Sequence, residues 1–176
     1  MTIRAYLRGS MTVLGVVLAV GVSGTPPAGA DEWDGDNWAL NGIYVATSNG
    51  DWAATDDVYR NEATVVSRWT ISMNCPDVLH CSGMVSSDAG WGAPISLVNT
   101  EYVVLRDIPA WEPCPNGAAA VTGHQRIRFS PVNDVGYIWP GSHYFSGVDK
   151  TLGESGGCRD NDTLEIAMPF TLQKSG

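Results

Sequence analysis

Few residues in this 176-residue chain have the types and spacing that nucleophilic catalysis requires. Ser142 and His143 form the one place where a serine and a histidine are neighbours. Adjacent residues on a strand point to opposite faces, so these two side chains cannot form a catalytic dyad with each other. The other histidines, His80 and His124, are isolated in sequence, which is typical of structural or solvated histidines. We therefore name no catalytic residue.

Paired acids are the second group that could do chemistry. Two carboxylates held at a set separation across a cleft carry out glycoside hydrolysis, and clustered carboxylates also suit calcium. The acids that fall close together are Asp34 and Asp36, Asp56 and Asp57, and Asp160 and Asp162. None has the spacing of an EF-hand loop. A hydrolase is the least favoured function, one irregular calcium site stays open, and we name no metal ligand.

The four cysteines are the strongest signal of compartment. All of them lie beyond residue 30, and an even number in an exported chain favours two disulfides over metal ligation or free thiols. Three pairings are possible. We predict Cys75 with Cys81, because that pair is local, and Cys114 with Cys158 as the remainder. The spacing does not match a zinc finger or ribbon, so we predict neither zinc nor any other cofactor.

Three tryptophans stand in connections rather than in alternating runs. Trp52, Trp91 and Trp111 lie in segments rich in glycine, proline or aspartate. In one interpretation they plug the open end of the fold, where a large ring buries apolar area. In the other they form a binding surface, either a stacking platform for sugar rings or the mouth of an apolar cavity. For a binding module we predict that all three lie near one end of the fold and contact the ligand.

The first 30 residues have the composition of a secretory signal peptide. Arg4 and Arg8 precede an apolar run over residues 11–22, and Ala28-Gly29-Ala30 offers a cleavage site. The run is about a dozen residues long, short of the roughly 20 that a membrane-spanning helix needs. The sequence therefore predicts cleavage near Ala30 and a secreted form that begins at Asp31 without a transmembrane segment.

Removing residues 1–30 from the 176 leaves 146, which suits one domain over residues 31–176 with a single core. The removed part holds two arginines and no acid. The remaining chain has eight lysines and arginines against nineteen aspartates and glutamates, a formal charge of −11. Such a surface repels phosphate backbones, so nucleic acid is excluded as a partner and anionic lipid headgroups are disfavoured.

Most of the chain beyond the leader reads as short strands with turns between them. Residues 63–75 alternate between apolar odd positions and polar even ones, and with residues 81–87 they form a predicted hairpin whose tip carries Cys75 and Cys81. Residues 51–61 and 108–117 are predicted loops. The other predicted strands are residues 41–48, 95–98, 101–106, 125–130, 135–139, 143–148 and 163–172.

These patterns predict an all-β fold. Seven to eight short strands separated by Gly, Pro, Asn and Asp turns, with almost no helical periodicity, indicate a single antiparallel barrel or sandwich. Residues 101–106 are apolar on both faces, which suits a strand that is covered twice or lines an internal cavity. Together with the chain length, this favours a small up-and-down barrel slightly over a sandwich.

Several segments also resemble a known family as a set. They are LNGIYVATSNGDWA, DDVYRNEATVVSRWTIS, the C-x5-C followed by SDAGW, IPAWEPCPNG and the closing EIAMPFTL. The set resembles a family of small secreted proteins from mycobacteria and related actinobacteria, over most of the chain beyond the leader. The resemblance implies export to the cell envelope or medium. It carries no catalytic residue across.

Three functions are therefore compared. The first is a secreted, non-catalytic module that binds an apolar or glycan ligand of the cell envelope. The second is an interaction or inhibitor protein that acts on another exported protein through an aromatic, acidic surface. The third is a hydrolase with dispersed acids. An internal cavity would favour the first, a flat exposed tryptophan cluster the second, and two facing carboxylates in a cleft the third.

Overall fold

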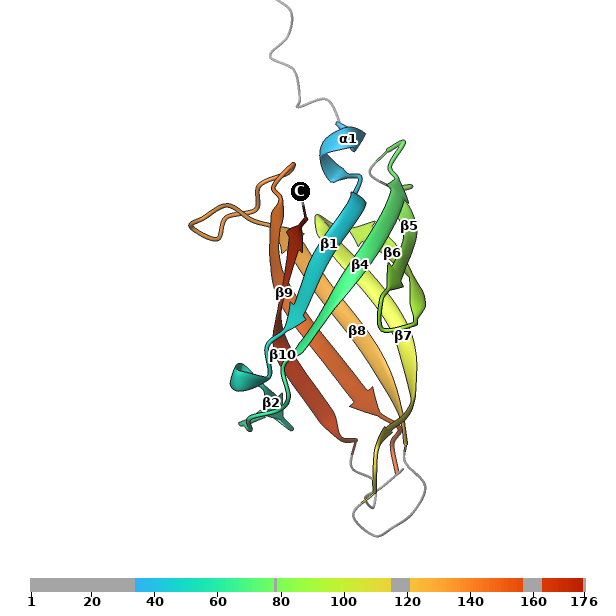
Figure 1. Ribbon diagram of the computed structural model, residues 1–176, viewed down its shortest axis with the longest axis vertical. Coiled ribbons are helices and arrows are strands. Elements are labelled where there is room, and N and C mark those ends of the chain that lie inside the picture. Colours follow the sequence, from blue (N-terminus) through green and yellow to red (C-terminus); the bar gives the residue numbers. More distant parts are fainter. Residues whose placement is uncertain (1–33, 78, 115–120, 157–162, 176) are drawn as a thin grey trace, which may run out of the picture. The chain divides into compact units, whose positions relative to one another are not determined.

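The computed structural model describes residues 34–77, 79–114, 121–156 and 163–175. The predicted signal peptide lies outside these residues. The described chain folds into a closed, eight-stranded antiparallel β-barrel (Figure 1). Around the barrel the strands follow in the order β1 (Asn41–Ser48), β4 (Val65–Asn74), β5 (Ser82–Ser87), β6 (Gly92–Val98), β7 (Glu101–Glu112), β8 (Val121–Pro131), β9 (Tyr144–Gly153) and β10 (Glu165–Lys174).

The barrel closes where β10 pairs with β1, from Tyr44 opposite Lys174 to Ser48 opposite Phe170. β10 is longer than this pairing. Its remaining part pairs with the two-residue strand β2 (Ala54–Thr55), which forms a small hairpin with β3 (Val58–Tyr59). Closure removes the sheet edges that β1 and β10 would otherwise present to each other's side of the barrel. It confirms the all-β prediction and decides for a barrel against a sandwich.

Two short helical segments flank β1. The helix α1 (Gly35–Trp38) begins after Asp34, whose side chain caps it by accepting from the Asp36 N–H at 3.1 Å, and it lies at one end of the barrel in Figure 1. The Tyr102 hydroxyl inside the barrel donates to the Trp38 carbonyl at 2.6 Å. The 3-10 turn η1 (Gly50–Trp52) follows β1 at its other end. α1 therefore covers one end of the core.

Aromatic side chains fill the half of the barrel next to α1. Phe129 of β8 lies at the centre of this group, with its ring 5.3 Å from both Tyr102 and Phe170 and 6.0 Å from Phe145. Trp69 packs on the same cluster, 5.4 Å from Phe170. Each of these side chains is at most 2% exposed. The alternation predicted for β4, β8 and β10 therefore points the expected large residues inward.

Three predicted segments differ from the structure. The segment 51–61, predicted to be a loop, contains the short strands β2 and β3. The segment 108–117, predicted to be a loop because of its three prolines, is strand as far as Glu112. The segment 135–139, predicted to be a strand, is a turn held by the Asn133 side chain, which accepts from the N–H groups of Val135 and Tyr137 at 3.2 and 2.9 Å. Local side-chain hydrogen bonds of this kind compete with strand pairing.

The strand over residues 101–106 is apolar on both faces for two different reasons. Tyr102 and Val104 are fully buried inside the barrel. Val103 and Leu105 lie on the outer face, where Leu105 is 54% exposed, so the strand is not covered twice along its length. The sequence pattern also allowed a second alternative, a strand that lines an internal cavity. This alternative applies to the part of β7 beyond Leu105.

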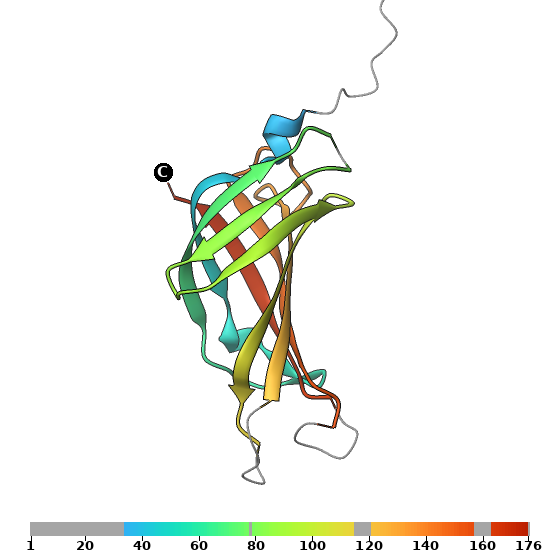
Figure 2. The same cartoon turned by 90° about the vertical axis from the view of Figure 1, so that its right-hand side faces the viewer.

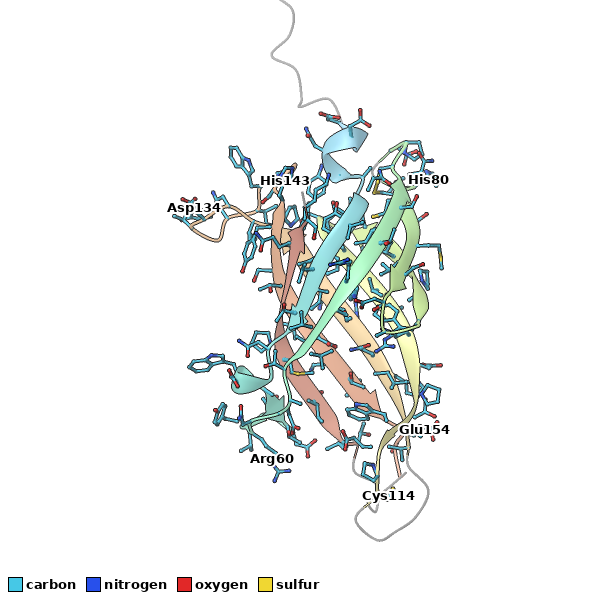
Figure 3. The ribbon with its side chains drawn as sticks, viewed as in Figure 1. Arg60, His80, Cys114, Asp134, His143 and Glu154 are labelled. Atoms are coloured by element: carbon cyan, nitrogen blue, oxygen red, sulfur yellow. A yellow bond between two sulfur atoms is a disulfide. The ribbon has the colours of Figure 1, made fainter. Side chains whose placement is uncertain are left out.

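The disulfide prediction is confirmed for the hairpin. Cys75 and Cys81 are bonded to each other between β4 and β5. Cys114 is also disulfide-bonded, and Figure 3 places it at the end of the barrel opposite α1. Its predicted partner, Cys158, lies outside the described residues, so that pairing stays a prediction.

Candidate functional site

The barrel interior holds a cavity of about 370 Å³ on the side of the aromatic core that faces away from α1. An eight-stranded barrel is just wide enough to be filled by side chains or to hold one small ligand. Here the core fills one half and the cavity occupies part of the other. Its apolar wall includes Val65, Ile108, Ile127, Met168 and Phe170, and its polar wall includes Ser48, Ser67, Arg106, Gln125, Asp149 and Thr151.

Short strands explain where the cavity opens. β5 pairs with β4 only from Trp69 onward, and β6 pairs with β7 only as far as Val104. Residues 65–68 of β4 and 105–112 of β7 consequently have no strand between them. Residues that line the cavity come from both of these segments and from the β5–β6 turn. The β5–β6 hairpin is visible in light green in Figure 2. The cavity therefore opens sideways, between β4 and β7 and beneath the turn.

A bulge in β7 brings Trp111 into the cavity. The register with β8 shifts between Ile108 and Glu112, and Ala110 in this interval has a φ of +50°. In a regular strand Trp111 would share the outer face of Leu105. The bulge breaks the alternation and turns the indole inward, where it lines the cavity.

Glycine on the neighbouring strand makes the space for that indole. A Cβ added at Gly123 of β8 would lie 2.7 Å from the Cγ and Cδ2 atoms of Trp111, which no real contact allows. Gly153 of β9 lies further along the same ring, where an added Cβ would be 3.6 Å from Trp111 Cζ3. The ring therefore rests on a smooth floor of two glycine backbones, and Gly123 is required for its position.

Trp91 and Arg106 form the rim of the opening. Trp91 lies in the β5–β6 turn, and its ring packs edge-on against Trp69 at 5.4 Å. The Arg106 guanidinium lies over the Trp91 ring, with its Cζ 4.2 Å from the ring centroid. This is a cation–π contact, which is stronger where water is partly excluded. The turn itself is tied to β4, because the Asp88 carboxylate accepts from the Arg68 N–H at 2.9 Å.

A chain of hydrogen bonds runs from Arg106 across the cavity wall. The Arg106 Nε donates to the Gln125 side-chain oxygen, and the Gln125 amide nitrogen donates to both oxygens of Asp149, at 2.8 and 2.9 Å. The Ser48 hydroxyl donates to the Asp149 Oδ2 at 2.6 Å. Asp149 is only 2% exposed. One chain of hydrogen bonds therefore connects these four side chains, which fixes their rotamers.

Burial shifts the pKa values of both ends of this chain. Burial raises the pKa of Asp149 above its ordinary value, while the hydrogen bonds from Ser48 and Gln125 and the charge of Arg106 act in the opposite direction. Burial lowers the pKa of Arg106, and the charge of Asp149 opposes that shift. An arginine starts so far above neutrality that it stays protonated. The cavity wall therefore carries a permanent positive charge at the rim, on Arg106, and a carboxyl group buried away from solvent, that of Asp149.

The three predicted tryptophans do not all lie at the cavity. It brings Trp91 and Trp111 together on one cavity. Trp52 lies in η1 outside the barrel, is 71% exposed, and is not among the residues that line the cavity. A role for Trp52 in ligand contact stays a prediction without a place in this cavity.

Sequence reasoning missed the polar wall residues. The alternation of inward and outward positions along each strand could have identified them. Gln125 shares the inward face of Ile127 and Phe129, and Asp149 shares that of Phe145. A polar residue in the apolar phase of a strand is a buried polar group, and such groups are paired. Arg106 could be found in the same way, because it follows Tyr102 and Val104 in alternation.

The other candidates for chemistry have structural roles or lie at the surface. The Ser142 hydroxyl donates to the Val132 carbonyl at 2.7 Å and accepts from the Tyr144 N–H at 3.1 Å, so it holds a turn. His80 and His143, labelled in Figure 3, lie near the α1 end of the barrel. His80 and His124 each contact one exposed aspartate, Asp77 at 2.8 Å and Asp107 at 2.7 Å.

The described lining of the cavity does not contain the carboxylate pair of a glycoside hydrolase. Asp149 is the one carboxylate among the described residues that line it, whereas glycoside hydrolysis requires two. Gly153-Glu154-Ser155-Gly156-Gly157 has the spacing of a nucleophile elbow. Gly153 ends the antiparallel strand β9, and Gly157 lies outside the described residues.

Neither a group of metal ligands nor a membrane-spanning helix is present among the described residues. Within residues 34–77, 79–114, 121–156 and 163–175, no three His, Cys, Asp or Glu side chains gather where they could hold one metal ion. Over the same part of the chain, no helix has the length and apolar character to cross a membrane.

Comparisons with known proteins give a structural match and no sequence match. No family model matches the chain, and no curated protein matches it. Among solved structures, the barrel is similar to the monomer form of the sensor domain of PknI from M. tuberculosis. The two share 12% sequence identity with a TM-score of 0.53, over 78% of this chain and 88% of the other. At this identity the similarity shows the fold.

Proposed function

We propose that this protein is a secreted, non-catalytic binding module that holds one small ligand inside the barrel. The observation that carries the proposal is the cavity of about 370 Å³, which opens sideways beneath the β5–β6 turn. Its size falls within the range of about 300–1,000 Å³ that is usual for ligand pockets. The bulge at Ala110 and the glycine at position 123 allow the Trp111 ring to lie in this cavity.

The lining favours a ligand with an apolar body and few polar groups. Trp111, Ile108 and Met168 present apolar surface to the cavity, and the side chains of Ser48, Gln125 and Asp149 are already hydrogen-bonded to one another. A glycan would need many free donors and acceptors. Of the two envelope ligands considered from sequence, a small apolar molecule or a short lipid therefore suits the cavity better than a glycan.

Two further findings support an exported binding role. The Cys75–Cys81 disulfide suits an oxidising compartment, in agreement with the predicted cleavage near Ala30. The similar solved structure is a sensor domain, a class of module compatible with binding without catalysis. Both support the proposal at the level of export and binding, and the cavity supplies the site.

The test is native mass spectrometry of protein purified from its own host, followed by a cavity-filling variant. A co-purifying small molecule is the expected result for the wild-type protein. Ala46→Leu adds bulk to the cavity wall from β1 and should remove the ligand while the β-sheet circular dichroism stays intact. Val45→Leu changes the outer face of the same strand and should keep it. Equal ligand occupancy in both variants would contradict the proposal.

One observation favours the second function, an interaction or inhibitor protein. The turn between β8 and β9 presents four exposed apolar side chains: Val135 at 69%, Tyr137 at 73%, Ile138 at 52% and Trp139 at 61%. Its backbone is ordered, because the Trp139 N–H donates to the Pro131 carbonyl at 2.9 Å. Exposed apolar patches mark contact surfaces. An exported protein that co-purifies with the chain, and is lost in a Tyr137→Ser/Trp139→Ser variant, would support this alternative.

A further inference from the structure

Arg106 is the one cationic side chain among the described residues that line the cavity. We propose that its guanidinium binds the carboxylate of the ligand, which makes the ligand a small apolar carboxylate. This inference rests on the proposed function and names the chemical class that the site would select. Three features of the site support it. They are the position of Arg106, its two Nη groups, and the hydrogen bonds that already occupy the oppositely charged Asp149.

The guanidinium is held in place before any ligand arrives. Its Nε donates to Gln125, which is itself fixed by two hydrogen bonds to Asp149, and its Cζ lies over the Trp91 ring, 4.2 Å from the ring centroid. A guanidinium has five N–H donors in a rigid planar fork. The structure gives the two Nη groups no hydrogen bond within the described residues. A planar acceptor with two oxygens is the group that such a fork fits best.

Asp149 does not offer an equivalent site for a cationic ligand. Both of its oxygens accept hydrogen bonds, from Gln125 and from Ser48, and the side chain is 2% exposed. An ammonium group would have to displace these donors and leave them unpaired in the barrel interior, which is unfavourable. The charge that remains available to a ligand is therefore positive.

The location of Arg106 sets the orientation of the ligand. Arg106 lies at the rim, under Trp91, and the apolar wall of Ile108, Trp111 and Met168 lies within the cavity. A carboxylate at the rim keeps contact with water while the apolar body enters the barrel. The acidic surface of the protein repels anions at long range, but ordinary salt screens that repulsion beyond about 10 Å, whereas the contact with Arg106 is direct.

The experiment compares three ligands that share one apolar chain and differ in head group. Binding of decanoate, decanol and decylamine to the full chain is measured by isothermal titration calorimetry. We expect decanoate to bind at least about tenfold more tightly than decanol, because a charge-assisted hydrogen bond contributes more than a neutral one. Arg106→Gln should reduce decanoate binding to the level of decanol. Arg126→Gln is the matched control, because Arg126 lies on the outer face of β8.

Each result separates the inference from the proposed function. Equal binding of decanoate and decanol, or unchanged decanoate binding in Arg106→Gln, overturns the carboxylate while the binding cavity stands. Tighter binding of decylamine overturns it in favour of Asp149. If none of the three binds, the proposed function fails together with the inference. Should Arg106→Gln not fold, Arg106→Lys keeps the charge and removes the fork, and an intermediate loss of decanoate binding supports the inference.

Discussion

The amide nitrogen of Gln125 lies 2.8 and 2.9 Å from the two carboxylate oxygens of Asp149, inside the barrel. Ser48 donates a third hydrogen bond to the same carboxyl group. Asp149 is therefore buried but fully satisfied, and it fixes Gln125, which in turn orients Arg106. This arrangement links the stability of the barrel to the geometry of the cavity rim.

The buried carboxyl group predicts a pH dependence of stability. Because burial raises the pKa of Asp149, the folded chain binds this proton more tightly than the unfolded chain. Its contribution to the free energy of unfolding is greatest below the ordinary aspartate pKa of 3.8 and declines as pH rises through the raised native value. Asp149→Asn should remove this decline. Urea unfolding of both proteins across the acidic range measures the difference.

Other groups titrate over the same range, so the comparison with the variant is essential. Burial and the charge of Glu62 raise the pKa of Glu112, and contact with His80 lowers that of Asp77. These contributions cancel between wild type and Asp149→Asn. Asp149→Ala should instead lose about 2–3 kcal/mol of stability, because Gln125 and Ser48 are left unpaired. Parallel pH profiles of the wild type and Asp149→Asn would contradict the prediction.

Two glycines provide a matched test of the Trp111 position. Gly123→Ala places a Cβ 2.7 Å from Trp111, whereas at Gly153 the added Cβ would be 3.6 Å from the same ring, an ordinary contact. We expect Gly123→Ala to lower the free energy of unfolding by about 1–3 kcal/mol and Gly153→Ala to have a much smaller effect. Thermal unfolding measures both, and an equal loss at the two positions would show that the indole is free to move.

The cavity separates the three tryptophans in a binding assay. Trp111→Ala and Trp91→Ala should each weaken decanoate binding by about 1–3 kcal/mol, because each removes an aromatic wall. Trp52→Ala should leave the affinity unchanged, because Trp52 is 71% exposed outside the cavity. Calorimetric titration with retained β-sheet circular dichroism is the measurement. A loss in Trp52→Ala equal to that in Trp111→Ala would place the site elsewhere.

The two predicted disulfides should differ in their effect on stability. Loop entropy assigns about 2.4 kcal/mol to the short Cys75–Cys81 loop and about 4 kcal/mol to the longer loop between Cys114 and Cys158. Replacing the second pair by serine should therefore lower the melting temperature more than replacing the first. Peptide mapping without reduction checks the pairing, and a link between Cys75 and Cys114 would refute it.

The predicted leader gives a direct mass test. The secreted protein should begin at Asp31, because Ala28-Gly29-Ala30 is a small-residue cleavage site. Intact-mass measurement of protein collected from the host medium or envelope identifies the first residue. A mass that includes residues 1–30 would contradict secretion by cleavage at this site.

The inward face of each strand could be predicted from the sequence alone. The period-two alternation of Trp69, Phe129 and Phe170 with polar neighbours is a local property, because successive side chains on a strand point to opposite faces. The same rule placed Cys75 and Cys81 across one hairpin. It failed at residues 135–139, where the Asn133 side chain holds the backbone in a turn.

The site depends on tertiary structure, because its members meet only when the barrel closes. Gln125 and Asp149 are 24 residues apart in sequence, and Ser48 and Asp149 are 101 apart. The inward direction of Trp111 depends on a bulge and on a glycine in the next strand. The alternation predicts which face of the sheet a residue occupies. Whether a cavity remains depends on which strands are neighbours, on their register and on the lengths of β5 and β6. The sequence predicted export and determined an all-β domain, and only strand pairing decided that Arg106, Trp91 and Trp111 surround one space.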